Sequence, residues 1–445
     1  KDSNGNQATL QLTLTVLETE NKDAFITTWT VTEDDKTIRI GTFSILDYDY
    51  IIDWGDETEE NITLSESPEH TYPNAGTYTV AITGQFPAMF MENVVEESKH
   101  LSSIEQWGNV EWESFTRSFF FCENMVYNAT DAPDLSKVSS TQEMFIDCHK
   151  FNGDLSEWDV SNVTNMLEMF KNAFVFNGNV DNWNVGNVEN MSGMFTNASE
   201  FNRDISGWNV STVNNMNQMF KNTTEFNQDI SIWDDKLGNV ITMFEMFAGC
   251  DKFNQDISGW DVSNVKDVDG MFRDTGAFNQ NLGPWGDKLG NVDSFEGMFE
   301  GSVFNQDIGD WDVSHVKDMN RMFKDATEFN QDLSSWNVGN VENMGEMFKN
   351  ATAFDQNLGS WDLTSMKPSA GSTIDSMEGM LDNSGLSTEN YSATLAAWAL
   401  APDITPSDIT LGAAGLVYCG LGIEAHDYLT SNFKNWAIQE DSECE

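Results

Sequence analysis

Carboxylates, histidines and cysteines are the residues of this 445-residue chain whose types could support catalysis or hold a metal. Asp53 and Asp56 in "DWGDE" are close enough to suggest a catalytic carboxylate pair, but such residues also shape turns, and we expect a turn. No Gly-rich phosphate loop, HExxH or GxSxG motif occurs, and the acidic clusters lack EF-hand spacing. The histidines lack a partner at ligand spacing: His70, His100, His149, His315 and His426. The sequence therefore predicts a protein that is not an enzyme.

A sequence repeat makes up most of the chain, so its fold must position any side chains that bind a partner. Close copies of "FNQDISGWDVSNV" (Phe253–Val265) recur nine times between Phe151 and Phe354, with a period near 25 residues. The first half of each copy has a strand-like rhythm, and the second half, as in Val163–Phe170, spaces apolar residues as one or two helical turns would. A unit of this length buries its apolar face only by stacking. We expect a mostly β fold with short helical turns, a solenoid of nine coils like that of leucine-rich repeats.

Three kinds of residue recur at fixed places in the repeat and predict structural columns along the stack. Tryptophans should line the interior: Trp158, Trp183, Trp208, Trp233, Trp260, Trp285, Trp311, Trp336 and Trp361. Asparagines should satisfy turn backbone groups, with Asp355 closing their column: Asn152, Asn177, Asn202, Asn227, Asn254, Asn279, Asn305 and Asn330. Methionines should fill the core: Met166, Met191, Met216, Met243, Met319 and Met344.

Alternation along the strand-like half predicts a binding face. If Trp158 and Val160 point inward, Asp159 points outward on a concave sheet. The same position in the other coils gives the rest of this face: Asn184, Asn209, Asp234, Asp261, Asp312, Asn337 and Asp362. A polar, carboxylate-rich stripe suits a basic protein segment, Ca²⁺ or a glycan. A solvated face that only keeps the protein soluble is the alternative.

The cysteines follow the same period. Cys122 and Cys148 are 26 residues apart, about one coil, so they could form a disulfide between adjacent coils. They could equally be small buried residues, like the alanines of other coils. Cys419 and Cys444 are a second candidate pair, and Cys250 should be a free buried thiol.

Composition excludes some partners. The net charge is −51, with 73 acidic and 22 basic residues, which repels nucleic acid and anionic membranes. No run of about 18 apolar residues occurs, so we expect no membrane insertion. No cofactor is expected apart from Ca²⁺, which would relieve the repulsion between the carboxylates.

The chain divides into five predicted segments. Residues 1–21 alternate as one strand, residues 24–86 contain short strands typical of a small β-sandwich, and residues 87–150 read as an N-terminal cap of degenerate repeats. The nine coils span residues 151–382. Residues 383–445 form a C-terminal cap with two predicted helices, Leu386–Leu400 and Ala425–Ile438. Because the first residue is Lys1 and the chain starts in strand alternation, we expect an excerpt of a longer protein.

Several stretches resemble known families. "DWGDE" and "HTYPNAGTYTVAITG" (His70–Gly84) resemble the PKD domain, an extracellular β-sandwich, and residues 1–21 resemble the last strand of an immunoglobulin- or cadherin-like module. The repeat in Phe253–Phe272 is similar to that of BspA-like leucine-rich-repeat surface proteins, and the order of segments looks like secreted Bacteroidetes proteins. This resemblance implies a bacterial cell-surface or secreted protein that binds a ligand and has no catalytic activity.

Two functions follow as hypotheses. In the first, the solenoid is an adhesion or interaction module that presents its acidic face to a protein partner. In the second, it is a carbohydrate-binding accessory protein whose row of Asp and Asn side chains hydrogen-bonds to sugar hydroxyls. Sugar sites usually expose aromatic rings, and the tryptophans fall on the inward side, which favours the first.

Overall fold

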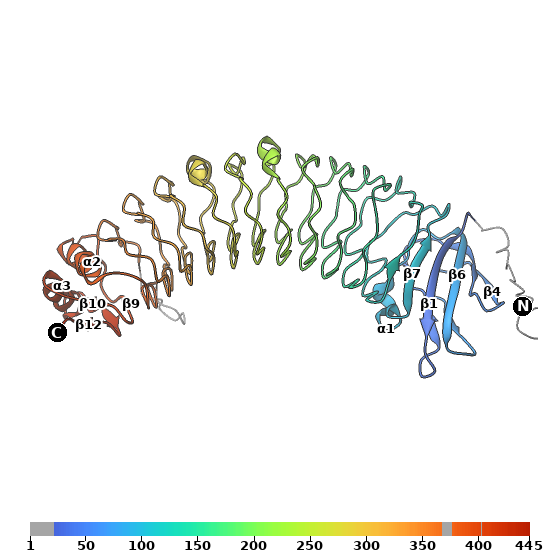
Figure 1. Ribbon diagram of the computed structural model, residues 1–445, viewed down its shortest axis with the longest axis horizontal. Coiled ribbons are helices and arrows are strands. Elements are labelled where there is room, and N and C mark those ends of the chain that lie inside the picture. The colour runs from blue at the N-terminus through green and yellow to red at the C-terminus, as the bar shows by residue number, and fades with distance from the viewer. Residues whose placement is uncertain (1–21, 367–375, 402) are drawn as a thin grey trace, which may run out of the picture.

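The computed structural model describes residues 22–366, 376–401 and 403–445, so the strand predicted within residues 1–21 lies outside the described residues. The molecule is an arch, with a β-sheet at its N-terminal end, a curved row of stacked coils, and a helical region at its C-terminal end (Figure 1). Helices are few and short in the described residues. The chain is thus a repeat protein made mostly of β and coil structure.

The N-terminal sheet has six strands. Burial alternates along β1, as its sequence FITTWTV predicts, and β1 lies between β6 and β7, antiparallel to both. The order across the sheet is β4 (Glu59–Ile62), β3 (Asp49–Asp53), β6 (Gly76–Gln85), β1 (Phe25–Val31), β7 (Leu101–Gln106) and β8 (Val126–Tyr127). A separate antiparallel pair consists of β2 (Thr37–Arg39) and β5 (Glu69–Thr71). Because β7 and β8 are parallel neighbours, the predicted segments 24–86 and 87–150 share one sheet that leads into the coils.

A parallel backbone ladder joins each coil to the next along one side of the stack. In one such step, Met166 and Phe170 donate their backbone N–H groups to the carbonyls of Asn190 and Met194, both at 2.9 Å. An isolated parallel bridge accompanies the ladder, for example between Asn165 and Asn190. These bonds satisfy buried backbone groups, although the described part of the array contains no long strand.

In the coils up to residue 366 the second half consists of tight turns, so the predicted helical turns are wrong. Glu168 and Asn172 have φ of 51° and 61°, which no right-handed helix contains. The next coil has Gly193 and Asn197 at these two positions, and glycine and asparagine are the residues that adopt a left-handed backbone most readily. Two successive turns with a left-handed third residue bury apolar residues at intervals of three and four, as a helix does.

The first half of each coil is also built from turns, and the predicted strand is absent from it. Trp158 donates its backbone N–H to the Leu155 carbonyl at 3.1 Å, and Val163 donates to Val160 at 2.9 Å. Such bonds, from residue i+3 to residue i, close four-residue β-turns. The apolar side chains still point inward, because each turn brings Leu155, Trp158 and Val160 to the same side.

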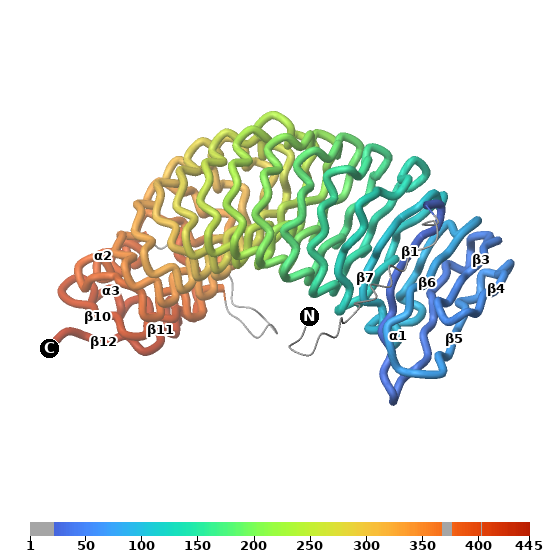
Figure 2. Tube along the Cα trace, turned by 45° about the vertical axis from the view of Figure 1, so that its right-hand side comes forward, coloured from blue at the N-terminus to red at the C-terminus, as the bar shows by residue number. Residues whose placement is uncertain are grey.

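Curvature follows from unequal spacing of the coils. The rings of Phe170 and Phe195, next to the ladder, are 5.6 Å apart between centroids, whereas those of Trp183 and Trp208 are 6.3 Å apart. Neighbouring coils therefore lie farther apart on the tryptophan side than on the ladder side. The stack bends toward the ladder, which produces the arch seen in Figures 1 and 2.

Two coils carry two extra residues each, and the extra residues form short 3-10 helices on the convex rim. These helices are η2 (Ser231–Lys236) and η3 (Gly283–Lys288), the green and yellow coiled ribbons along the upper edge of Figure 1. Leu237 and Leu289 are buried where other coils have valine, as expected. Near the N-terminal end, η1 (Met91–Val94) and α1 (Val95–Ser98) precede β7.

The C-terminal end differs in part from expectation. Helix α2 (Thr388–Leu400) begins after Ser387, whose Oγ accepts the Asn390 N–H at 3.2 Å, as predicted for an N-cap. A second helix is present, as predicted, but its predicted bounds, Ala425–Ile438, are wrong. Helix α3 spans Leu421–Thr430, and the residues after it form β11, which needs an extended backbone to pair with β9. The short strands here are β9 (Thr410–Gly412), β10 (Val417–Tyr418), β11 (Ala437–Gln439) and β12 (Ser442–Glu443).

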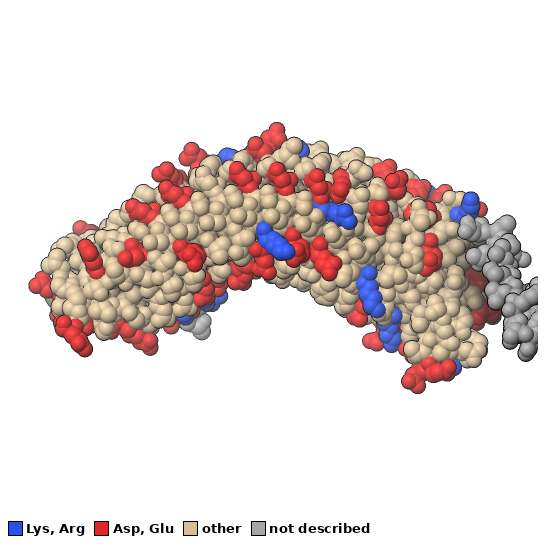
Figure 3. Space-filling model, in the orientation of Figure 1, with Lys and Arg blue, Asp and Glu red and all other residues tan. Residues whose placement is uncertain are grey.

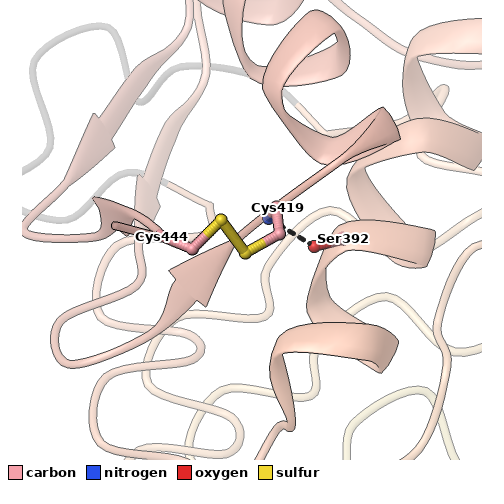
Figure 4. Close-up of a disulfide and its surroundings, with 3 residues drawn as sticks. All are labelled: Ser392, Cys419 and Cys444. Carbon is pink, nitrogen blue, oxygen red and sulfur yellow. Dashed lines mark hydrogen bonds between the residues drawn. A yellow bond between two sulfur atoms is a disulfide. The ribbon is translucent and has the colours of Figure 1, made fainter.

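One of the two predicted disulfides is present. Cys419 and Cys444 are bonded, with their Cα atoms 5.5 Å apart, and the Cys419 N–H donates to Ser392 Oγ at 2.9 Å (Figure 4). The proposed bond between Cys122 and Cys148 is wrong, because both thiols are free and buried. Cys148 Sγ instead contacts a backbone carbonyl at 3.1 Å. Cys250 is free and buried, as predicted.

Candidate functional site

The repeated asparagines bind neighbouring coils together. Asn152 Oδ1 accepts the Asn177 backbone N–H at 2.8 Å, and the column continues coil by coil until Asn330 Oδ1 accepts the Asp355 N–H at 2.9 Å. In most coils the next residue is a glutamine that donates Nε2 to the same asparagine oxygen, for example Gln280 to Asn254 at 2.9 Å. Sequence reasoning missed the glutamines, although "FNQ" recurs visibly. These residues thus have a structural role, which is to join neighbouring coils.

The tryptophan column is structural too. All nine tryptophans are at most 4% exposed, and the methionine column is buried beside them. Trp260 Nε1 donates to the Ile230 carbonyl of the preceding coil at 3.2 Å, and the other indoles from Trp183 onward repeat this bond. The indoles are therefore satisfied inside the stack and unavailable to a ligand.

The predicted binding-face residues lie on the outer rim, which we define as the turns equivalent to residues 154–161 in each coil. Asp234 belongs to η2 on the convex edge, and its counterparts occupy the same place in their coils (Figure 1). The expected concave strand face is wrong, because the ladder that makes the inner side lies half a coil away. Exposed members are Asp159, Asn184, Asn209, Asp234, Asp312 and Asn337, and half-buried ones are Asp261 and Asp362.

Short hydrogen bonds hold the rim carboxylates in place. Asp159 Oδ1 accepts the Ser161 N–H at 3.1 Å, and most rim positions repeat this bond. A second row five residues earlier, which sequence reasoning missed, does the same; Asp229 Oδ1 accepts the Ser231 N–H at 3.0 Å. The Ser231 hydroxyl and then its backbone N–H lower the pKa of Asp229, and Ser161 does so for Asp159. These carboxylates therefore stay charged in mild acid.

Ion pairs lie on the opposite, inner edge, the turns equivalent to residues 166–173. Glu346 accepts Lys324 Nζ and Lys349 Nζ, both at 2.7 Å, and Arg273 pairs with Glu245 at 2.8 Å. Burial opposes ionisation of Glu346, but the hydrogen bonds from Lys324 and Lys349 lower its pKa to about 2. Within the described residues, no rim aspartate has such a pair. Figure 3 shows acidic side chains spread along the arch with few basic ones between them.

The carboxylates of "DWGDE" form a turn, as expected. Asp53 Oδ1 accepts the Gly55 N–H at 2.9 Å, and Asp56 Oδ1 accepts the Thr58 N–H at 3.2 Å. Asp56 Oδ2 also lies 2.9 Å from His70 Nε2, a pairing that the sequence spacing did not reveal. The His70 ring in turn stacks on the neighbouring tryptophan at 4.9 Å. Both carboxylates thus have structural partners.

In residues 22–366, 376–401 and 403–445, no group of three or more His, Cys, Asp or Glu side chains is arranged to hold a metal ion. No helix in the described part of the chain is long and apolar enough to cross a bilayer.

Three overlapping stretches match one family model, described as "Mycoplasma protein of unknown function, DUF285". They are residues 113–233, 203–303 and 288–384, which together span more than half of the chain. The matched residues run from 113, before the first repeated coil, to 384, and so include the coil stack. No curated protein matches the chain.

Proposed function

This chain belongs to the DUF285 family, and we propose that it is a secreted or cell-surface adhesion module that presents its acidic outer rim to a protein partner. It catalyses no reaction in this proposal. The partner's surface is basic, because a rim of carboxylates attracts lysine and arginine and repels anions.

The observation that carries the proposal is the difference between the two edges of the arch. The inner-edge glutamates are paired with lysine and arginine, whereas the rim aspartates are held by neutral hydrogen bonds and keep their charge. A fixed, ionised carboxylate loses little conformational freedom when it meets a cation. Repetition over nine coils gives a partner many weak contacts at once.

The finer assignment of the fold is part of the proposal. We take the coil stack to be a leucine-rich-repeat-like solenoid of the BspA-like type, and the N-terminal sheet to be a PKD-like spacer. Support comes from the stacked 25-residue coils and from the buried Trp54 and Tyr72 within the two motifs that resemble PKD. A location outside a bacterial cell follows from this assignment, and the Cys419–Cys444 disulfide suits such an oxidising place.

The carbohydrate-binding alternative receives less support at the outer rim. Its tryptophans are buried, so the rim has no aromatic surface on which a sugar ring could stack. Ca²⁺ remains a proposed ligand of the rim carboxylates. Millimolar Ca²⁺ should then raise the melting temperature above that measured in EDTA at equal ionic strength, and an unchanged melt would remove this part of the proposal.

A charge-neutral rim variant tests the proposal. Replacing Asp204, Asp229 and Asp256 by asparagine removes three charges and keeps the turns, because Asn179 and Asn281 already make the same bond in other coils. The wild-type protein and the variant are each used to capture surface proteins of host or neighbouring cells, with quantification by mass spectrometry. We expect basic proteins on the wild type and loss of the same proteins from the variant.

The matched control removes three charges from the N-terminal sheet region. Asp47→Asn, Glu57→Gln and Glu59→Gln change exposed residues far from the outer rim in sequence and leave the coils intact. The control should capture the same basic proteins as the wild type. Equal capture by the wild type and both variants, or equal loss from both, would contradict binding through the rim.

A further inference from the structure

A shallow polar groove crosses the first four coils on a side face of the stack, between the outer rim and the ladder. One row of its lining comes just before the second conserved valine of each coil: Asn162, Asn187, Thr212 and Asn239. The other row comes just after that valine and includes Thr164, Asn214 and Ile241. The four coils are neighbours along the arch, as the trace in Figure 2 shows. By the usual strand spacing the groove is roughly 14 Å long, enough for a chain molecule.

The groove is nearly uncharged on a protein with a net charge of −51. Glu189 is the one ionisable residue that lines it. The following coils carry charges at the position of Thr164, namely Lys266, Asp293, Lys317 and Glu342. Three of the four groove coils carry a neutral residue at this position, with Glu189 as the exception, so the groove suits a neutral ligand.

The groove side chains are oriented before a ligand arrives. Asn187 and Asn239 each donate Nδ2 to a backbone carbonyl of the preceding coil at 2.7 Å, which fixes the amide and leaves Oδ1 as an acceptor. Thr212 Oγ1 is fixed in the same way by two carbonyls, at 3.0 and 2.9 Å. In the part of the chain that the structure describes, the Asn162 and Asn214 side chains have no partner. Fixed and free amides thus alternate along the groove.

Such a surface matches a chain of hydroxyl groups. A hydroxyl donates and accepts through one oxygen, and amide and threonine side chains also do both. Ile241 is 47% exposed and offers an aliphatic surface to the C–H face of a sugar ring. An acidic polysaccharide or a nucleic acid would be repelled by the surrounding charge. A peptide would need several apolar pockets for its side chains, and Ile241 is the one apolar residue in the groove lining.

We infer that this groove binds a neutral glycan, with the amides of Asn187 and Asn214 as its main contacts. This site is separate from the acidic rim and takes a different class of ligand, so it stands or falls independently of the adhesion proposal. The glycan lies along the stack and contacts successive coils with equivalent groups.

The test uses the full chain on an array of neutral oligosaccharides of glucose, galactose, mannose and N-acetylglucosamine. Sulfated and sialylated glycans and extended peptides serve as the other arms. We expect binding to at least one neutral oligosaccharide and none to the anionic arms. The double variant Asn187→Ala, Asn214→Ala should bind it at least about tenfold more weakly, since two hydrogen bonds are lost.

Asn291→Ala is the matched control. Asn291 donates Nδ2 to the Ser263 carbonyl at 2.6 Å, as Asn187 does in its own coil, but it lies outside the groove. Its replacement removes the same structural hydrogen bond and should leave glycan binding unchanged. The inference is overturned if no neutral glycan binds, if peptides bind instead, or if the control weakens binding as much as the double variant.

Discussion

Trp260→Ala should destabilise the coil stack by about 4–6 kcal/mol. The Trp260 indole is fully buried, and its ring stacks on that of Trp233 at 6.2 Å and tilts against that of Phe247 at 6.1 Å. Truncating a buried aromatic residue to alanine costs about 3–5 kcal/mol through lost burial and the cavity left behind. Loss of the Nε1 bond adds about 1 kcal/mol, although the Ile230 carbonyl still accepts the Trp233 backbone N–H at 3.1 Å.

Guanidinium unfolding followed by far-ultraviolet circular dichroism measures this cost, because fluorescence would average over 15 tryptophans. Each coil contacts only its neighbours, so the substitution should lower the transition midpoint or split the transition into two. Trp260→Phe is the matched control. It keeps most of the packing and loses only the Nε1 bond, so it should cost roughly 1–2 kcal/mol. A cost below about 1 kcal/mol for Trp260→Ala would refute the interior column, and equal costs for both variants would refute packing as its main contribution.

Three further predictions concern other parts of the chain. Burial raises the pKa of Asp269 to about 6, above its value in the unfolded chain. The folded state therefore holds this proton more tightly, and the free energy of unfolding should fall as pH rises from about 4 to 6. Asp269→Asn should remove this fall and stabilise the protein at pH 7 by about 1–3 kcal/mol in urea unfolding. Asn254→Ala removes the Oδ1 that accepts the Asn279 N–H, so it should cost about 1–2 kcal/mol in the same assay. Asn254→Asp should cost less, because a side-chain oxygen still accepts this bond, as Asp355 accepts the Ser387 N–H. Equal costs for the two variants would contradict the acceptor role. Reduction of the Cys419–Cys444 bond should destabilise the C-terminal region by about 2–4 kcal/mol. The melting temperature of this region should therefore fall on reduction, and an unchanged melting temperature would contradict this.

The interior columns could be predicted from the sequence because identical residues recur at a fixed period. An asparagine in eight coils and a tryptophan in nine have no reason to recur unless each coil covers the next, and the contacts of Asn152 and the burial of Trp158 show that it does. The C-terminal disulfide also followed from its position. These features depend on which residues lie in register, and the period gives the register directly.

The local backbone could not be read from apolar spacing. Two turns with left-handed residues at Glu168 and Asn172 bury apolar residues three and four positions apart, as a helix does. The apolar pattern in Val163–Phe170 therefore fits both structures. The distinguishing signal was the recurrence of glycine and asparagine at two positions four residues apart, as at Gly193 and Asn197.

The edge of the coil on which the candidate site lies also could not be predicted from the sequence pattern. Alternation shows that Asp159 points outward but does not say to which edge of the coil it belongs. That depends on where the backbone ladder forms, since the stack bends toward the ladder and places the aspartates on the convex side. The groove could not be found from the repeat, because the asparagines of its first row also occur in coils outside the groove, for example at Asn291.

Zero-length carbodiimide cross-linking tests the central claim most directly, because it joins a carboxylate to a lysine amine only where the two touch. Once a protein partner has been captured, the cross-linked peptides are identified by mass spectrometry. Binding through the outer rim predicts links from partner lysines to Asp204, Asp229 or Asp256. Links confined to the N-terminal sheet, for example at Glu59, would contradict it.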